Sequence, residues 1–541
     1  MNEKSRMAEY LKVSNNLKVG KAPELSGSDR TLYRILEAIP GVLSWGLLLV
    51  LVILSYFKPV WVAYFIIVFD VYWLLLVLYL GIHLFVSYFK MRGGQRVDWL
   101  KKCQELDAGS IKGLPEGCLA KKGWKTEDII HVIIDPTAVE PVDVLRPSFE
   151  SIINDGFPTK HIIFVLALEE REGEKGLEKG RILKEEFGHL FKEFLVTVHP
   201  DGMAGELKGK GANQAWAAKI LKDEIIDKQG LDYDKIVVSV FDSDTVVYPS
   251  YFACLTYKFL TVNDPYRASY QPVPLYHNNI WEVPFFSRVA AMSNTFWQMM
   301  QQIRVEKLAT YSSHSMTWRA LVEIGFWSTN MVSEDSRIFW HCYLYYNCDY
   351  RVEPLYFPVS MDSLQVQSTW KTVVGLYKQQ RRWGWGVENL PYLIFNVIKR
   401  WKSLKKRDAI GKIMIQIHGF HSWATNALII ACIGWLPIIL GGSRFNSTVL
   451  SGNLPQVTRN LMTVAMSGLL FSAIVSTLLL PHRPKSVGLW RKLYTRILAV
   501  LEWLMLPVGI IIFGAIPALD AQTRLMLGKY MGFLVTPKER R

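Results

Sequence analysis

Apolar residues are concentrated in long runs toward both ends of the chain, and the first two runs lie close together. Residues 39–57 are almost free of charge, and residues 60–89 resume the pattern after a break of two residues. Each run can cross the core of a bilayer, which takes about 20 helical residues. The pattern predicts a polar N-terminal tail over residues 1–38 and a transmembrane hairpin over residues 39–92.

Basic residues follow the hairpin at once, and they indicate its orientation. The first of them are Lys90, Arg92, Arg96, Lys101 and Lys102. Positively charged residues beside membrane spans favour the cytoplasmic side. We therefore expect the N-terminal tail in the cytoplasm and a cytoplasmic linker over residues 93–130.

The middle of the chain, residues 131–365, changes to short β-branched runs that alternate with helix-length segments. The runs are residues 131–135, 162–168, 194–198 and 236–241, and the segments between them are residues 141–155, 178–193 and 212–228. This alternation predicts an α/β domain with a mostly parallel sheet. Ligands bind such sheets at the carboxyl ends of the strands, so candidate site residues should follow the strands.

Apolar runs return near the C-terminus after a basic amphipathic stretch. Residues 387–407 combine apolar residues at helical spacing with six lysines and arginines, which is typical of a helix in a membrane interface. We assign it to a segment over residues 366–410. Two further spans are expected within residues 411–480, at residues 413–440 and 461–480, joined by an outer loop.

The last segment, residues 481–541, begins with a strongly basic stretch, which favours the cytoplasmic side. The apolar residues 497–519 are interrupted by proline and glycine. They predict a broken, re-entrant or interfacial element that leaves the tail inside.

Charge and cysteine content narrow the possible partners. The formal net charge is +14, and 50% of the residues are hydrophobic. With apolar runs at both ends, this charge suits an anionic membrane surface or a phosphate-bearing substrate. No zinc finger or RNA-binding signature supports a nucleic-acid partner. None of the six cysteines forms a CxxC pair, so we expect reduced thiols.

Asp242-Ser243-Asp244 directly follows the strand expected at residues 236–241. Two carboxylates at a strand end can share Mg²⁺ or Mn²⁺, which keeps most of its ligand sphere for phosphate and water. The same residues also fit the DxDxT/V pattern of haloacid-dehalogenase-like phosphatases, in which the first Asp is a nucleophile. Both interpretations stay open on this motif alone.

Three more groups could carry chemistry, and two of them have a plain structural alternative. In Ser333-Glu334-Asp335, Asp335 is a candidate general base, although Ser-Glu-Asp also suits a helix start. Lys210 opens a probable helix, where it could bind phosphate. Gln379 to Trp383 offers Arg382 for a diphosphate and Trp383 for a sugar ring, or belongs to an interfacial aromatic belt.

In this order, the motifs resemble those of the membrane-integrated members of glycosyltransferase family 2, such as cellulose and hyaluronan synthases. The matching segments are Pro136–Pro141 (PTYNEP-like), Asp242–Asp244 (DxD), Ser333–Asp335 (TED-like), Gln379–Trp383 (QxxRW) and Phe533–Lys538 (FxVTxK). The resemblance implies an α/β GT-A fold, Rossmann-like and inserted between transmembrane helices, in a multi-pass membrane protein. It also implies a nucleotide-sugar donor, usually a UDP-sugar, with Mg²⁺ or Mn²⁺.

The same resemblance assigns roles to individual residues. The donor and acceptor would be bound by Thr137, Glu140, Asp242, Gln379, Arg382 and Trp383, with Thr536 and Lys538 in a loop that closes over the nucleotide. Lys210 is a further candidate substrate-binding residue because of its place at the start of a helix, and not through the resemblance. The metal would be held by Asp244 with Asp242. Asp335 would be the base, with Glu334 beside it in the catalytic pair. The family usually has Asp residues after the second strand, where this sequence has Leu168-Glu169-Glu170. The preference for a particular nucleobase in the donor is therefore open.

The resemblance therefore implies inverting sugar transfer to a growing polysaccharide or a lipid-linked acceptor. The protein would lie in the cell membrane among its lipids, with the catalytic domain in the cytoplasm. The phosphatase is one alternative. A membrane transporter or channel with a regulatory soluble domain is another, and it predicts that the carboxylates are dispensable.

Overall fold

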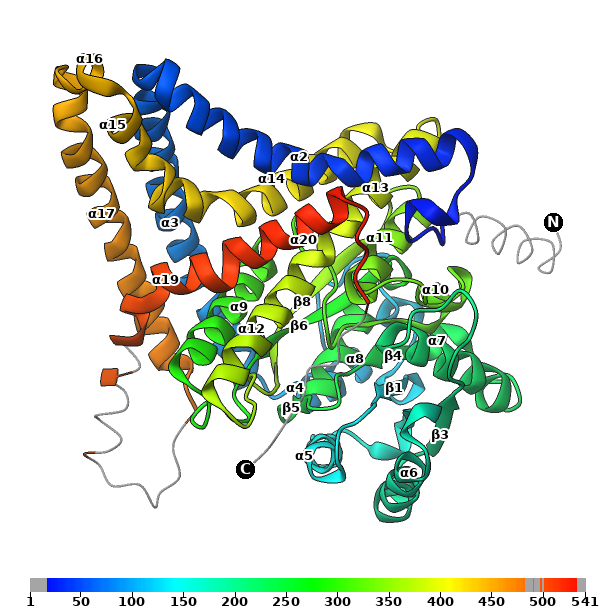
Figure 1. Cartoon of the computed structure of the whole chain (residues 1–541). Helices are drawn as coiled ribbons and strands as arrows, with labels where there is room; N and C mark the ends of the chain where they lie inside the picture. The colour runs from blue at the N-terminus through cyan, green and yellow to red at the C-terminus, as the bar shows by residue number, and fades with distance from the viewer. Residues whose placement is uncertain (1–16, 482–489, 491–496, 499–500, 533–541) are drawn as a thin grey trace.

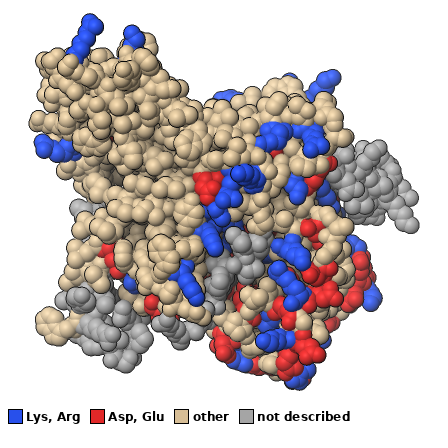
Figure 2. All heavy atoms as spheres, viewed as in Figure 1, with Lys and Arg blue, Asp and Glu red and all other residues tan. Residues whose placement is uncertain are grey.

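A computed structural model describes residues 17–481, 490, 497–498 and 501–532. Figure 1 shows two parts: an α/β domain, and a group of long helices that extends away from it. The surface of the long helices in Figure 2 is almost free of charge, whereas Lys, Arg, Asp and Glu crowd the α/β domain. This separation of polarity agrees with helices that lie in lipid and a domain that lies in water.

Four helices are long and apolar enough to cross a membrane, and a fifth candidate is a bent pair. The four are α2 (Gly27–Phe57), α3 (Pro59–Arg96), α17 (Val449–Leu479) and the stretch Glu502–Met526, and the pair joins α14 (Lys406–Ala431) to residues 433–440 at an angle of 43°. Pro59 occupies the first turn of α3, where a missing N–H costs no hydrogen bond.

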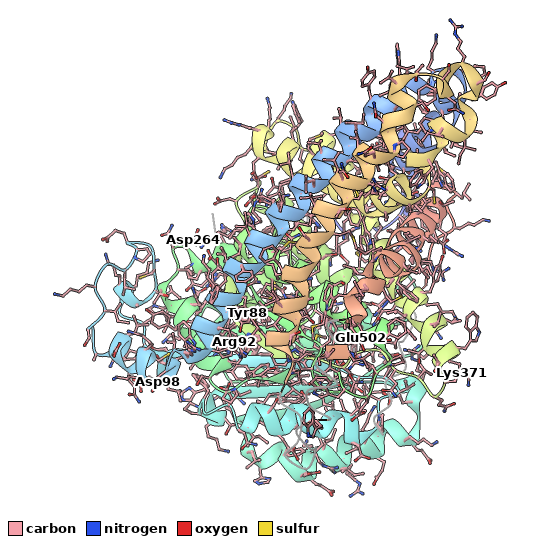
Figure 3. The ribbon with its side chains drawn as sticks, turned by 90° about the vertical axis from the view of Figure 1, so that its left-hand side faces the viewer. Tyr88, Arg92, Asp98, Asp264, Lys371 and Glu502 are labelled. Atoms are coloured by element: carbon pink, nitrogen blue, oxygen red, sulfur yellow. The ribbon has the colours of Figure 1, made fainter. Side chains whose placement is uncertain are left out.

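Helices α3 and α17 run side by side over most of their length, as Figure 3 shows. Close to the α/β domain, Arg92 of α3 donates to the carbonyl oxygen of Leu478 at 3.1 Å. At the far end, Ala63, Phe445 and Leu454 form a small buried cluster. The start of α3, the short helix α16 (Gly442–Asn446) and the start of α17 thus meet at the tip.

The α/β domain is built on an eight-stranded mixed sheet with the order β3-β2-β1-β4-β7-β6-β8-β5. Its parallel half contains the four strands that the sequence predicts: β1 (Ile130–Pro136), β2 (Ile162–Glu169), β3 (Glu193–His199) and β4 (Ile236–Val240). Their β-branched side chains suit a sheet that is covered on both faces. This fold and the flanking apolar helices confirm the expected fold class.

The other half of the sheet was not predicted from the sequence. It consists of β5 (Val246–Val247), β6 (Ala268–Leu275), β7 (Ser315–Thr317) and β8 (Arg351–Ser360). Strand β7 is antiparallel to both β4 and β6, and β6 is parallel to β8. The sheet is therefore mixed, and its second half places polar loops beside the end of β4.

Helices cover both faces of the sheet and connect it to the long helices. The helices of the parallel half are α5 (Val142–Ile153), α6 (Glu174–Phe187), α7 (Lys210–Leu221) and α8 (Tyr251–Thr261), and the later ones are α9 (Phe285–Ile303), α10 (Trp318–Glu323), α11 (Glu334–Tyr345), α12 (Thr369–Gly384) and α13 (Asn389–Lys399). Helix α9 packs against α3, and α12 packs against α20 (Ile516–Met526).

Two expected segments differ from the structure. The prediction of an outer loop between residues 440 and 461 is wrong, because α16 and the first turns of α17 occupy most of this segment. The single helix expected over residues 387–407 is divided: α13 ends at Lys399, and α14 begins at Lys406. The apolar side of α13 packs against α2 and α11, so protein contacts bury Leu390, Leu393 and Val397.

Candidate active site

Asp242, which begins the motif directly after β4, is held by two side chains that come from other parts of the chain. Lys210 Nζ lies 2.7 Å from Asp242 Oδ1. Ser312 Oγ donates to Asp242 Oδ2 at 2.6 Å. The carboxylate is therefore oriented by groups from the start of α7 and from the loop before β7.

Lys210 also reaches Asp335, at 3.1 Å from Oδ1. One buried ammonium thus joins the DxD motif to the Ser333-Glu334-Asp335 motif. Burial disfavours the charge on Lys210, but Asp242, Asp335 and Glu334 outweigh it and raise the pKa of Lys210 above its ordinary value. The lysine is cationic at any physiological pH, which places a fixed positive charge between the two motifs.

Asp244 is buried at the edge of the same cavity. Its Oδ2 accepts the backbone N–H of Asp362 at 2.9 Å, and its carbonyl oxygen accepts the Asn278 amide at 2.8 Å. The described residues include no group of three or more His, Cys, Asp or Glu side chains placed to hold a metal. The carboxylates of Asp242 and Asp244 still fit Mg²⁺ or Mn²⁺, since these ions take few protein oxygens when they bind with phosphate.

The loop after β1 carries Thr137 and Glu140, and a buried lysine holds it closed. Glu140 Oε2 accepts from Thr137 Oγ1 at 3.1 Å and from the Ala138 N–H at 2.8 Å. Lys179 of α6 donates to Thr137 Oγ1 and to the carbonyl oxygens of Ala138 and Glu140 at 2.9–3.3 Å. Lys179 also pairs with Glu172. The loop is thereby fixed beside the end of the parallel sheet.

Glu334 and Asp335 open α11 and differ in environment. Burial, and then the charge of Asp335, raise the pKa of Glu334 well above its ordinary value. The Asp335 carbonyl oxygen accepts from Thr310 Oγ1 at 2.6 Å. The Asp335 side chain is about a quarter exposed, whereas Glu334 is almost fully buried. The two neighbouring acids therefore present very different groups to the cavity.

Glu388, which follows α12, also holds the loop before α11 in place through hydrogen bonds. Glu388 Oε1 accepts from Ser333 Oγ at 2.6 Å and from the Ser333 N–H at 2.9 Å. Glu388 Oε2 accepts from the Trp385 indole at 2.8 Å. One buried carboxylate therefore joins the Ser333-Glu334-Asp335 motif to the end of the QxxRW helix.

The two adjacent arginines of α12 make different contacts. Arg382 lines the cavity together with Gln379 and Trp383. Arg381 instead points to α20, where it pairs with Asp520 at 2.9 Å. The motif thus faces the site on one side and anchors to the C-terminal helix on the other.

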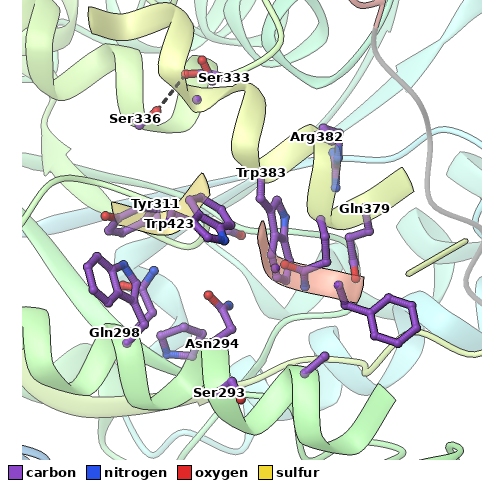
Figure 4. Close-up of a pocket in the computed structure, with 18 of the residues that line it drawn as sticks. Ser293, Asn294, Gln298, Tyr311, Ser333, Ser336, Gln379, Arg382, Trp383 and Trp423 are labelled. Carbon is purple, nitrogen blue, oxygen red and sulfur yellow. Dashed lines mark hydrogen bonds between the residues drawn. The ribbon is translucent and has the colours of Figure 1, made fainter. Parts of the chain in front are cut away.

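A single cavity of about 1290 Å³ brings these groups together. Figure 4 shows Gln379, Arg382 and Trp383 on one wall, with Ser293, Asn294 and Gln298 across from them. The expected site residues that line it are Thr137, Glu140, Lys210, Asp242, Asp244, Glu334, Asp335, Gln379, Arg382 and Trp383. The cavity continues between the long helices, where α3, α14 and the segment 505–514 line it.

Two expected site residues, Thr536 and Lys538, lie outside the residues that the structure describes. The described part of the chain ends near the site, since Met531 packs in a cluster with Val332 and Trp385.

Sequence analysis missed Lys179, Glu388 and the polar residues of α9. Lys179 sits in a strongly charged helix, where it resembles a solvated residue. Glu388 acts on a residue 55 positions earlier in the chain. A cluster of amides within an otherwise apolar helix, Asn294 to Gln302, was the one available signal.

A family model described as "Glycosyl transferase family group 2" matches residues 237–513. Among solved structures, one similar chain is the mannosyltransferase PcManGT from Pyrobaculum calidifontis in complex with GDP-Man and Mn²⁺. The similarity covers 72% of this chain and 99% of that chain, with 12% sequence identity and a TM-score of 0.40. No curated protein matches the sequence.

Proposed function

Because this chain belongs to glycosyl transferase family group 2 and is therefore a glycosyltransferase, we propose that it moves a sugar from a UDP-sugar to a growing polysaccharide or a lipid-linked acceptor. The transfer would be a single displacement that inverts the anomeric carbon. Family membership favours this function over the phosphatase and the transporter.

The observation that carries the proposal is the position of Lys210 between Asp242 and Asp335. A nucleotide sugar has two reactive regions, a diphosphate and an anomeric carbon, which lie next to each other. A diphosphate requires positive charge, and the anomeric carbon requires a base for the incoming hydroxyl. Lys210 and Arg382 would supply the charge and Asp335 the base, within one cavity.

Asp335 is the better base of the two neighbouring acids. Burial and the charge of Asp335 raise the pKa of Glu334, so Glu334 keeps its proton to a higher pH than an ordinary glutamate does. The Asp335 carboxylate is partly exposed to the cavity, and Lys210 fixes its orientation. Asp335 would accept the proton of the acceptor hydroxyl as the new glycosidic bond forms.

The nucleotide would lie between the β1 loop and the DxD motif. Thr137 and Glu140 would contact the nucleoside, in a loop whose shape Lys179 fixes. Asp244, with Asp242, would hold Mg²⁺ or Mn²⁺, and a bound cation neutralises charge that develops on the leaving diphosphate. Gln379, Arg382 and Trp383 would bind the diphosphate and the end of the acceptor. Thr536 and Lys538 would belong to a loop that covers the nucleotide.

The apolar helices support a membrane location, and we propose that the α/β domain lies on the cytoplasmic side of the cell membrane. The proposed division of the chain is the one expected from the sequence, with the glycosyltransferase domain at residues 131–365. An acceptor could enter along the cavity, which is continuous from the DxD motif to α3 and α14.

A donor panel tests the proposal. The full chain, purified in detergent with membrane lipid, would be offered UDP-, GDP- and dTDP-sugars with Mn²⁺ or Mg²⁺. We expect release of nucleoside diphosphate from a UDP-sugar, loss of this release with EDTA, and recovery when Mn²⁺ is restored. No release from any donor would contradict sugar transfer, and release from a GDP-sugar alone would contradict the choice of UDP.

A further inference from the structure

We propose that a polar face of α9, made of Asn294, Gln298 and Gln301, binds the hydroxyl groups of a carbohydrate acceptor. This inference rests on the proposed function and names the class of its acceptor: a saccharide, rather than the phosphate group of a membrane lipid. The evidence is the placement of these amides, the side-chain oxygens of the two glutamines, which are unpaired in the described part of the chain, and the aromatic rings across the cavity from them.

The three amides share one side of α9. Their spacing of four and then three residues places side chains on the same helical face. All three line the cavity that holds Asp242 and Asp335. Gln298 and Gln301 are only 3% and 4% exposed, so these amides are buried in the cavity wall instead of lying on the surface.

The side-chain oxygens of the two glutamines are buried and, within the described structure, unpaired. Neither Gln298 Oε1 nor Gln301 Oε1 has a hydrogen-bond partner among the described residues. Buried polar atoms in folded proteins are almost always paired, and an unpaired one is costly. Since an amide can rotate by half a turn, each glutamine can present either an acceptor or a donor to a hydroxyl group.

The wall opposite α9 carries flat aromatic rings. Figure 4 shows Tyr311, Trp383 and Trp423 around the same space as Asn294 and Gln298. Asn294 donates to the hydroxyl of Tyr276, whose ring centroid lies 6.5 Å from that of Trp383. The polar face of α9 is thus connected to the aromatic residue of the QxxRW motif.

A saccharide matches this combination better than the other acceptors do. Its hydroxyl groups can pair with the amides, and the C–H faces of its rings can pack on Trp and Tyr. A lipid chain would leave two buried amides unpaired, which is unfavourable. A lipid phosphate needs cationic groups, and α9 presents neutral amides to this part of the cavity.

Gln302 offers a matched control on the same helix. It is fully buried, but it faces the sheet: its amide donates to the Gln271 carbonyl oxygen at 3.0 Å and accepts the Tyr356 N–H at 3.1 Å. A change at Gln302 disturbs the packing of α9 without removing a group from the cavity. It therefore separates loss of binding from general loosening of the helix.

The experiment measures saccharide binding and nucleotide binding separately. The full chain, its Q298M and Q301M variants and the Q302M control would be purified in a detergent without sugar groups. Cellobiose, maltose and diacetylchitobiose would be titrated while tryptophan fluorescence is recorded, with UDP and Mn²⁺ as the second ligand. Methionine keeps the approximate volume of glutamine and removes its hydrogen bonds.

We expect at least one disaccharide to bind the unchanged protein and to bind Q298M and Q301M about tenfold more weakly, with Q302M close to the unchanged protein. UDP affinity should stay the same in all four. The inference is overturned if Q298M and Q301M bind disaccharide as tightly as the unchanged protein does. It is also overturned if Q302M weakens this binding as much as Q298M and Q301M do. UDP binding without any disaccharide binding also overturns it, but leaves the donor proposal standing. If the unchanged protein does not bind UDP at all, the proposed function itself is overturned.

Discussion

Lys210 is the residue on which the proposed chemistry depends most, because it contacts two motifs that lie 93 positions apart in the sequence. Its ammonium would balance the carboxylates before a donor binds. A diphosphate would add negative charge to the same place, where Arg382 also lines the cavity. The site therefore combines carboxylates with the fixed positive charges of Lys210 and Arg382.

Exchanging each of the two neighbouring acids for its amide tests which one is the base. Asp335→Asn removes the proposed proton acceptor, so we expect kcat to fall by about 10²- to 10⁴-fold while donor binding stays largely intact. Glu334→Gln is the matched control. Because the raised pKa of Glu334 favours its protonated form, which an amide resembles, this change should cost much less. Product formation and UDP binding would be measured for both variants, and near-normal turnover in Asp335→Asn would refute the assignment.

The raised pKa of Glu334 also predicts a pH dependence of stability. Below the ordinary pKa of a glutamate, the side chain is protonated in both the folded and the unfolded chain. As the pH rises, the unfolded chain loses this proton first, so folding becomes less favourable until the pH passes the pKa of the folded protein. The stability of Glu334→Gln relative to the unchanged protein should therefore grow above about pH 5. Thermal unfolding from pH 4 to 8 checks this, and a constant difference would contradict it.

At the scale of elements, α11 and α12 act together through Glu388. The carboxylate accepts from Ser333 at the start of α11 and from Trp385 at the end of α12. A shift of either helix would move Asp335 relative to Trp383, and small displacements of a catalytic group slow a reaction strongly. Glu388 contacts the motifs but is not one of the described residues that line the cavity, so we regard it as a positioning residue.

Glu388→Gln should therefore lower kcat by about tenfold or more, with little change in the donor KM. The amide would turn a donor toward Ser333 or Trp385, and Glu388→Asp should recover part of the activity. Glu323→Gln is a suitable control, because Glu323 accepts from Tyr346 at the far end of α11. A positioning role would be contradicted if donor KM in Glu388→Gln rose by as large a factor as kcat fell. It would also be contradicted if Glu323→Gln lost as much kcat as Glu388→Gln.

The parallel half of the sheet and the ordered motifs could be predicted from local sequence. Strands β1, β2 and β4 are short apolar runs rich in Val and Ile, and the motif residues follow them as the fold requires. Strands β5 and β7 have only two and three residues, too few for a periodic signal. The beginning of α17 contains Gly452, Asn453 and Pro455, which favour a loop in isolation, and contacts with α3 make it helical.

The support of the site could not be predicted, because it depends on long-range contacts. Lys179, Ser312 and Glu388 reach the motifs from 42, 70 and 55 positions away. Nothing in their local sequence distinguishes them from other polar residues. A motif identifies the groups that touch a substrate, but the residues that orient these groups become visible only when the chain is folded.

For the whole molecule, the proposed topology places the two ends of the helical group on opposite sides of a membrane. At the tip, Pro59 packs against Gly441. At the other end, both described termini lie against the α/β domain: Lys18 donates to the Gly325 carbonyl oxygen, and Met531 packs in a cluster with Val332 and Trp385. If α3 and α17 cross the bilayer, the tip and the domain cannot lie on the same side.

Cysteine labelling in intact cells tests this topology. Arg444 lies in α16 at the tip and Lys529 lies beside the domain, and both are exposed. In a background with Cys432→Ser, which removes the one exposed native thiol among the described residues, Arg444→Cys should react with a membrane-impermeant maleimide. Lys529→Cys should react only after the cells are permeabilised. This arrangement would give the site access to a nucleotide-sugar donor in the cytoplasm. Labelling of Lys529→Cys in intact cells would place the domain outside and refute the proposed orientation, even if the purified protein transfers sugar.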